Sequence, residues 1–213
     1  MGARAWARRK LWARLAAVVV IVLVLLIRVG EVLFSRLKMP SIAKSTLGGA
    51  VFGLVGVALP LTMFTGSDQR KTVLHDQGTT LALGILVALV IAKMITFSVS
   101  LGSGFVGGPI FPALFIGGTA GAALHVAIPG VPLGLAFTCM LAAVPGALVS
   151  APFALVVLAV FMTQVGALQS APILITVITA YLSVEAVKYV LASRKYAKEQ
   201  AAAKVTGAHR AAK

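Results

Sequence analysis

The chain has 213 residues, of which 60% are hydrophobic and 11% are charged, and its mean hydropathy is +1.02. Soluble domains are about half apolar and about a quarter charged. The few polar residues here cannot solvate the surface of a soluble enzyme or form a nucleic-acid-binding module. The composition therefore predicts an integral membrane protein, and its apolar runs indicate an all-α one, since helices satisfy their own backbone groups in lipid.

The net charge of +14 is concentrated toward the two ends of the sequence. Nine of the nineteen Lys and Arg residues lie between Arg4 and Lys44, and seven lie between Lys188 and Lys213. No Asp, Glu, Lys or Arg occurs from Met94 to Val184. Because basic clusters beside membrane spans favour the cytoplasm, we expect both termini to be cytoplasmic in the cell membrane and to contact anionic lipid headgroups.

Apolar length and helix breakers predict about seven hydrophobic segments. They lie near residues 12–35, 46–64, 79–101, 110–128, 132–149, 152–168 and 172–193. A simple transmembrane helix needs about 20 apolar residues, and prolines such as Pro60, Pro145 and Pro172 interrupt several segments. We therefore expect a membrane domain at 12–193 with tilted, short or re-entrant helices, between a basic tail at 1–11 and a basic cytoplasmic tail at 194–213.

The first segment and the polar stretches each have their own interpretation. The first apolar run follows basic residues, as in a secretory signal peptide. No small-residue cleavage site comes after it, since Arg28 to Glu31 follow, so a retained membrane helix is expected. Polar residues from Gly66 to Thr80 predict an aqueous loop, and the tail from Arg194 is predicted to be a frayed helix or disordered.

Small residues predict close helix packing, with incidental lipid-facing glycines as the alternative. The spaced glycines are Gly48, Gly49, Gly53 and Gly56 in one segment and Gly117 and Gly121 in another. The single cysteine, Cys139, forms no internal disulfide and is expected to be a packing residue. The sequence contains no nucleophile elbow, no His/Glu metal spacing and no phosphate-binding loop, so no enzymatic activity, metal or cofactor is expected.

The stretch from Leu101 to Gly121, LGSGFVGGPIFPALFIGGTAG, is the strongest candidate for a ligand site. A Gly-rich turn leads into a helix near Pro112, and the first turn of a helix leaves backbone N–H groups unpaired. With the positive end of the helix dipole, such a turn binds anions. It holds them weakly enough for release, as conduction requires. Packing alone is the alternative explanation for these glycines.

Four further polar side chains have competing interpretations. Lys93 is a fixed charge inside a long apolar run, where insertion costs about 2.5–3.5 kcal/mol. It either raises the potential near an anion path or extends toward the membrane interface, and the second role is preferred. His125 either senses protons or is packed, and the packed role is preferred. Glu185 and Lys188 are expected to pair on a helix surface.

The run KMITFSVSLGSG at 93–104, continued by GGPIFP at 107–112, resembles the CLC family of voltage-gated-type chloride channels and transporters, where it leads into a Gly-Gly-x-Phe-x-Pro filter motif. TLGGAVFGLVGVALP at 46–60 resembles the glycine-rich helix that opens the second half of those proteins. APFALVVLAVFMT at 151–163 resembles their Ala-Pro-containing penultimate region. The order is consistent over residues 20–187.

This resemblance implies the second half of a CLC-like subunit, in which broken helices direct their amino ends at a dehydrated chloride. It implies a homodimer, or a partner chain that supplies the first half. The anion-binding residues carried over are Gly107, Gly108, Ile110, Phe111 and Ser103, with Gly102, Gly104, Pro109 and Pro112 as structural motif residues and Lys93 as an electrostatic one.

The sequence departs from the family pattern at two filter positions. Ile110 replaces the usual phenylalanine, and Pro109, which has no N–H, stands where the family offers a donating amide. The Gly-Ser-Gly-x-Pro and Gly-Lys/Arg-Glu-Gly-Pro motifs of the first half do not occur in this sequence. Two functions are therefore expected: anion transport, or a non-conducting remnant or assembly partner. The sequence does not choose between channel and proton-coupled exchanger, or between chloride, fluoride and nitrate.

Overall fold

The computed structural model describes residues 2–62, 83–128, 130–164 and 166–211, so the predicted aqueous loop lies outside the described residues. Every regular element in this part of the chain is helical, which confirms the all-α prediction. The elements are α1 (Gly2–Arg36), α2 (Ser41–Ala58), the 3-10 helix η1 (Pro60–Thr62), α4 (Leu83–Gly102), α5 (Ile110–Ala127), α6 (Leu133–Leu148), α7 (Pro152–Thr163) and α8 (Ala167–Ala211). Five helices are long and apolar enough to cross a membrane, whereas α6 and α7 are shorter.

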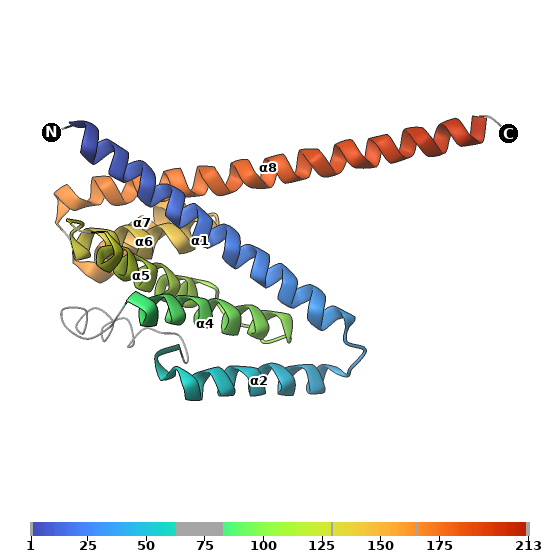
Figure 1. The fold of residues 1–213 in the computed structure, drawn as a ribbon, viewed down its shortest axis with the longest axis horizontal. Coiled ribbons are helices and arrows are strands. Elements are labelled where there is room, and N and C mark those ends of the chain that lie inside the picture. The colour runs from blue at the N-terminus through green and yellow to red at the C-terminus, as the bar shows by residue number, and fades with distance from the viewer. Residues whose placement is uncertain (1, 63–82, 129, 165, 212–213) are drawn as a thin grey trace.

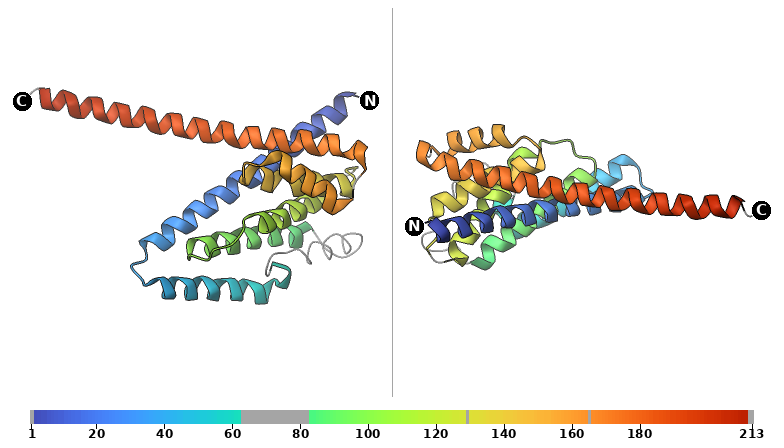
Figure 2. Two further views of the ribbon diagram at one scale, coloured as in Figure 1. Left: turned by 180° about the vertical axis from the view of Figure 1, so that it is seen from behind. Right: turned by 90° about the horizontal axis from the view of Figure 1, so that it is seen from above.

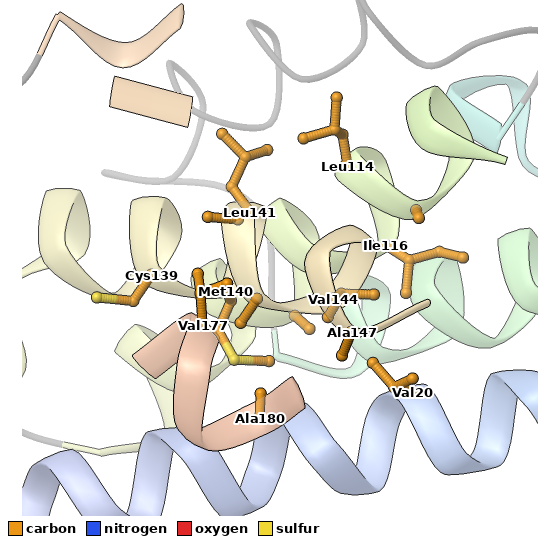
Figure 3. Packing of buried hydrophobic residues seen from close by; sticks show 14 of the residues in the cluster. Val20, Leu114, Ile116, Cys139, Met140, Leu141, Val144, Ala147, Val177 and Ala180 are labelled. Carbon is orange, nitrogen blue, oxygen red and sulfur yellow. The ribbon is translucent and has the colours of Figure 1, made fainter. Parts of the chain in front are cut away.

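Helices α5 and α6 form the centre of the bundle (Figure 1). Helix α5 is buried from Ala113 to Ala123 and α6 from Ala136 to Ala147, because nearly all their residues are apolar or small. Helices α1, α7 and α8 also pack on α6, and Figure 3 shows Val20 of α1 and Val177 of α8 in the shared core. Helix α2 lies at the periphery and packs mainly on α4.

Glycines bring α5 and α6 into backbone contact. A Cβ added to Gly121 would lie 2.8 Å from Phe137 Cα, and one added to Gly117 would lie 3.0 Å from the Met140 carbonyl carbon. Both distances are shorter than van der Waals contact, so only glycine permits this approach. The packing prediction is confirmed here, whereas Gly53 of α2 has nothing within 4 Å of an added Cβ.

Two prolines that were expected to interrupt helices lie inside them. Pro145 is within α6 and Pro172 is within α8. Proline in a helix removes one intrahelical hydrogen bond, but the apolar packing of both helices continues past it. Helix α8 therefore extends over 45 residues, through position 194, where the tail was predicted to begin. Helix α1 likewise begins at Gly2 and includes the basic segment.

Helices α1 and α8 pack on each other and run in the same direction along the long axis of the molecule (Figures 1 and 2). The basic cluster of α1 precedes its apolar span at Ala17–Arg36, whereas that of α8 follows its span at Ser170–Val190. The two clusters consequently lie at opposite ends of the bundle. The connection between α1 and α2 lies toward the same end as the tail of α8.

Candidate functional site

Helix α4 ends at the start of the Gly-rich stretch in a local arrangement that requires glycine. The N–H of Phe105 donates to Ser100 O at 3.1 Å, and the N–H of Gly104 donates to Leu101 O at 3.2 Å. This pair of bonds is the Schellman motif, in which the residue after the cap is left-handed. Gly104 has a φ of 96°, so the residue without a Cβ occupies the strained position. The motif turns the chain sharply away from α4.

Helix α5 begins at Ile110, with Pro109 as its N-cap. The carbonyl of Pro109 accepts the N–H of Ala113 at 3.2 Å, and Pro112 lies in the first turn, where its missing N–H costs no intrahelical bond. In the described loop and the first turn of α5, five backbone N–H groups donate to no backbone carbonyl. They belong to Val106, Gly107, Gly108, Ile110 and Phe111.

A cavity of about 150 Å³ lies against this loop. Its described lining residues come from α4 (Lys93, Thr96, Phe97, Ser100, Leu101), from the loop (Phe105, Val106, Gly107, Gly108), from α5 (Pro112) and from α2 (Phe52). None of these is acidic. The break between the two helices therefore combines amides without backbone acceptors, the positive end of the α5 dipole and a small cavity, and the first two of these favour negative charge.

The end of α4, just before the break, packs between α2 and α1. A Cβ added to Gly48 would overlap the Ser103 side chain, so the end of α4 packs tightly against α2. Gly48 is seven residues into α2, which corresponds to about 10 Å along a helix. On the other side, the Ser98 hydroxyl donates to Leu26 O of α1. Helices α1 and α2 therefore hold the end of α4 from both sides.

Ser103 is buried and makes its hydrogen bonds within the protein. Its hydroxyl donates to Ser100 O at 3.1 Å, and its carbonyl accepts the Ser45 hydroxyl at 3.2 Å. Ser103 is not among the cavity-lining residues, whereas Gly107 and Gly108 are. Of the expected anion-binding residues, Gly107 and Gly108 line the cavity, whereas Ile110, Phe111 and Ser103 do not. The Ser103 hydroxyl contacts the backbone of its own helix.

Lys93 is 2% exposed and lines the same cavity. Its Nζ donates to Thr62 O of η1 at 2.6 Å and lies 5.6 Å from the centroid of the Phe115 ring. A lysine that extends toward the membrane interface keeps its charged end in water. The burial of Lys93 within the protein disagrees with that interpretation.

The remaining polar candidates have structural roles. His125 Nδ1 lies 2.6 Å from Val131 O in the α5–α6 connection, which confirms a packed histidine. Cys139 is buried and unpaired in α6, as expected. Lys188 Nζ pairs with Glu185 at 2.6 Å on the exposed face of α8. In the part of the chain that the structure describes, no three His, Cys, Asp or Glu residues gather as a metal site.

Comparison with known proteins identifies the family. A family model described as voltage gated chloride channel matches residues 8–185, most of the chain. The chain belongs to this family. Its members are channels or transporters rather than enzymes, and the chain itself is a multi-pass membrane protein with an apolar surface suited to lipid.

Several curated relatives agree with this assignment. The YfeO proteins of Salmonella newport, Salmonella agona and Salmonella typhimurium, named for a proposed role in ion transport, are each 36% identical over 110 residues. The alignment covers 51% of this chain and 26% of each relative. The chain therefore spans about a quarter of the length of these relatives.

The sequence did not reveal every residue that shapes the site. Thr62, Phe52 and Gly30 were not singled out, because their contacts with α4 join segments distant in sequence. A Cβ added to Gly102 would lie 2.7 Å from the Gly30 carbonyl carbon, so these two glycines fix how closely α1 approaches the end of α4. The sequence signal for this contact is Gly30, a glycine near the end of the first apolar segment where no turn is predicted.

Proposed function

We propose that this protein transports a small anion, chloride or one of similar size, across the cell membrane as part of a voltage gated chloride channel family assembly, and that it has no enzymatic activity. The observation that supports this most directly is the helix break between α4 and α5, where backbone N–H groups without backbone acceptors lie beside a cavity. In this proposal Gly107, Gly108, Ile110 and Phe111 donate to the anion, and Ser103 supports the loop that presents them.

The residues at 102, 104, 109 and 112 act on the shape of the site. Gly104 reverses the chain after α4, Gly102 allows α1 to approach, and the carbonyl of Pro109 caps the first turn of α5. Pro112 has no N–H of its own, so it does not compete with the loop amides for the anion. The anion is thus held by dipoles, which bind weakly enough to let it leave.

The complete pathway requires further protein. Either a second copy of this chain or a chain that supplies the first half covers the open side of the loop, where Gly107, Gly108 and Phe111 are exposed. A homodimer is the simpler assembly because closed two-fold symmetry is the commonest arrangement of soluble oligomers. Chemical crosslinking in native membranes, followed by mass determination, distinguishes the two assemblies.

The decisive experiment measures chloride efflux from liposomes that contain the purified chain. We expect efflux above that of protein-free liposomes, and a loss of at least about tenfold when Gly107 and Gly108 are deleted together. Deletion of the exposed Gly166, which has nothing within 4 Å of an added Cβ, is the control. Unchanged efflux from a correctly folded loop-deletion variant would rule out this pathway.

A non-conducting assembly partner is the second candidate. Its support is that the chain aligns with about a quarter of each relative's length, together with Pro109, which removes one donor from the filter loop. Efflux that appears only after co-reconstitution with a protein carrying the first-half motifs would favour a subunit of a larger transporter. No efflux in either case would favour a non-conducting role.

The basic clusters allow a proposal about orientation. Since α1 and α8 run in the same direction, their two clusters cannot both face the cytoplasm if both helices span the membrane. We favour a cytoplasmic location for the tail of α8, because the connection with Arg36 and Lys38 lies toward the same end and the positive-inside tendency adds over both segments. The amino-terminal cluster then faces the opposite side.

A further inference from the structure

An apolar groove of about 330 Å³ lies near the start of α4, whereas the filter loop follows the end of that helix. Its described lining residues come from four helices and are all apolar, among them Val19 of α1, Val87 of α4, Ala127 of α5 and Met140 of α6. Val87 and Ala127 are exposed, so the groove opens at the surface of the bundle. An apolar space takes apolar ligands rather than water, and in a membrane the available ligand is a lipid acyl chain.

The length of the groove matches most of one acyl chain in one leaflet. Its lining residues run from Leu83 to Val90 on α4 and from Ala120 to Ala127 on α5, seven residues apart on each helix. Seven helical residues rise about 10 Å. The hydrocarbon core of a bilayer is about 30 Å thick, so each leaflet contributes about 15 Å. One chain of a lipid in one leaflet therefore fits the groove over about two-thirds of its length.

The groove lies toward the amino end of α1. Helices α1 and α4 run in the same direction, because the Ser98 hydroxyl donates to Leu26 O and Gly102 packs on Gly30 further along both helices. The start of α4 at Leu83, and the groove beside it, are therefore displaced toward the amino end of α1. Figure 1 shows α1 continuing from there to the amino terminus.

The segment of α1 that continues past the groove is basic and contains both tryptophans of the chain, Trp6 and Trp12. Tryptophan is enriched at membrane–water interfaces, where Lys and Arg attract anionic headgroups. No acidic residue precedes Glu31 in the sequence. The five cations of this segment are Arg4, Arg8, Arg9, Lys10 and Arg14.

The spacing along α1 places this charge near the headgroup of a lipid whose chain occupies the groove. Arg14 comes five residues before Val19, which lines the groove, and Arg8 comes eleven residues before it. These separations correspond to about 7 Å and about 16 Å along a helix. The positive charge therefore lies within one headgroup's reach of the groove.

We propose that the groove binds one acyl chain of an anionic phospholipid from the bilayer, and that the phosphate of the same lipid lies at the basic segment of α1. The four helices around the groove supply apolar contact with the chain. The basic segment supplies the preference for a negative headgroup. This site is separate from the anion pathway, since no described residue lines both the groove and the cavity beside the filter loop.

A second apolar groove provides a matched control. It lies between α2 and α4, has a volume of about 480 Å³ and is lined by apolar residues such as Leu54, Ala88 and Ile95. Helix α1 contributes nothing to its described lining, so the basic segment does not continue from its wall. This groove offers apolar contact without the charge of α1.

The test titrates the full chain, purified in detergent, with one of two lipids. Dioleoyl phosphatidylglycerol is anionic, and dioleoyl phosphatidylcholine has the same chains but no net charge. Native mass spectrometry measures the fraction of protein with one bound lipid. Ala127→Phe and Val87→Phe fill the proposed groove from two different helices, and Ala88→Phe fills the second groove from an exposed position.

Two further variants each replace four cations with glutamine. The first changes the basic segment of α1, at Arg8, Arg9, Lys10 and Arg14. The second is the control and changes the tail of α8, at Arg194, Lys195, Lys198 and Lys204. Thermal unfolding of each variant without added lipid identifies those that keep their fold, and the two groove-filling variants on different helices keep the test decisive if one of them does not.

We expect the unmodified chain to bind one phosphatidylglycerol about tenfold more tightly than phosphatidylcholine, because several cations act on one headgroup. Ala127→Phe and Val87→Phe should weaken phosphatidylglycerol binding by about tenfold, since lost contact with two methylene groups already has this effect. The substitutions in α1 should remove the difference between the two lipids. Ala88→Phe and the α8 control should preserve it.

Equal affinity of the unmodified chain for the two lipids would overturn the proposal, as would unchanged phosphatidylglycerol binding in the groove-filling variants. An equal loss in Ala88→Phe would show that lipid coats the apolar surface without a preferred groove, which also contradicts it. A preference for phosphatidylglycerol that survives the substitutions in α1 would reject the role of the basic segment. Chloride flux is not measured here, so these outcomes stay separate from that of the anion transport experiment.

Discussion

At the scale of single residues, Pro109 limits the number of donors in the filter loop. Its ring removes one N–H from a stretch whose other amides lack backbone acceptors. A hydrogen bond to a charged group contributes about 1.5–3 kcal/mol. We therefore expect Pro109→Ala to bind chloride about tenfold more tightly in ³⁶Cl⁻ binding. Alanine adopts the backbone conformation of Pro109, with φ at −74° and ψ at −13°, and keeps the carbonyl that caps Ala113.

The matched control for this substitution is Pro132→Ala. Pro132 is also the N-cap of a helix, α6, but it lies outside the Gly-rich loop that precedes α5. Its replacement should leave chloride affinity unchanged. An equal change in both variants would show that the effect comes from helix stability, and a weaker affinity in Pro109→Ala would contradict the role assigned to the added amide.

Gly104 carries the second prediction at this scale. Its φ of 96° lies in the region where a Cβ costs about 1–2 kcal/mol. Gly104→Ala should therefore lower the free energy of unfolding by about 1 kcal/mol or more, as measured by denaturant titration in detergent. Gly84→Ala, in α4 with open space around an added Cβ, should be neutral or stabilising. A neutral Gly104→Ala would show that the chain reversal after α4 does not require glycine.

At the scale of elements, the approach of α5 to α6 depends on Gly117 and Gly121. A larger side chain at Gly121 would meet the backbone of α6, which cannot move aside as a flexible side chain can. Overpacking of this kind costs about 1–3 kcal/mol or more. We expect Gly121→Leu to lower the thermal unfolding temperature in detergent by several degrees, and to shift α5 together with the filter amides at its start.

The control for this prediction is Gly134→Leu. Gly134 lies in α6 near its exposed end and has nothing within 4 Å of an added Cβ. Its substitution should change the unfolding temperature little. Similar losses in the two variants would mean that leucine disturbs these helices irrespective of position, and the close α5–α6 contact would not explain the result.

At the scale of the whole molecule, the shared direction of α1 and α8 predicts that their basic clusters lie on opposite membrane faces (Figures 1 and 2). Single cysteines at Lys10 and at Lys198 report this directly, since the native Cys139 is buried. In intact cells, we expect a membrane-impermeant maleimide to label Lys10→Cys but not Lys198→Cys until the cells are opened. Labelling of neither variant before opening would instead support two cytoplasmic clusters.

Local sequence was sufficient for the helical class, the approximate segments and the Gly-rich turn that leads into α5. The apolar composition indicates that lipid surrounds the protein, and lipid permits few structures other than helices. The spacing of Gly117 and Gly121 predicted close helix packing at these two residues. The Gly-rich motif before Pro112 predicted a helix start with unpaired amides. These features depend on neighbouring residues, so periodicity and spacing reveal them without knowledge of the fold.

Contacts between distant segments could not be obtained in the same way. Pro145 and Pro172 interrupt helices in isolation, but packing against neighbouring helices compensates for the lost hydrogen bond, so α6 and α8 continue. The burial of Lys93 and its bond to Thr62 join residues 31 apart, and the cavity also needs Phe52 of α2. The relative direction of α1 and α8 likewise depends on the fold of everything between them. Charge patterning along the chain therefore placed both clusters on one side, whereas the packing of the two helices places them at opposite ends.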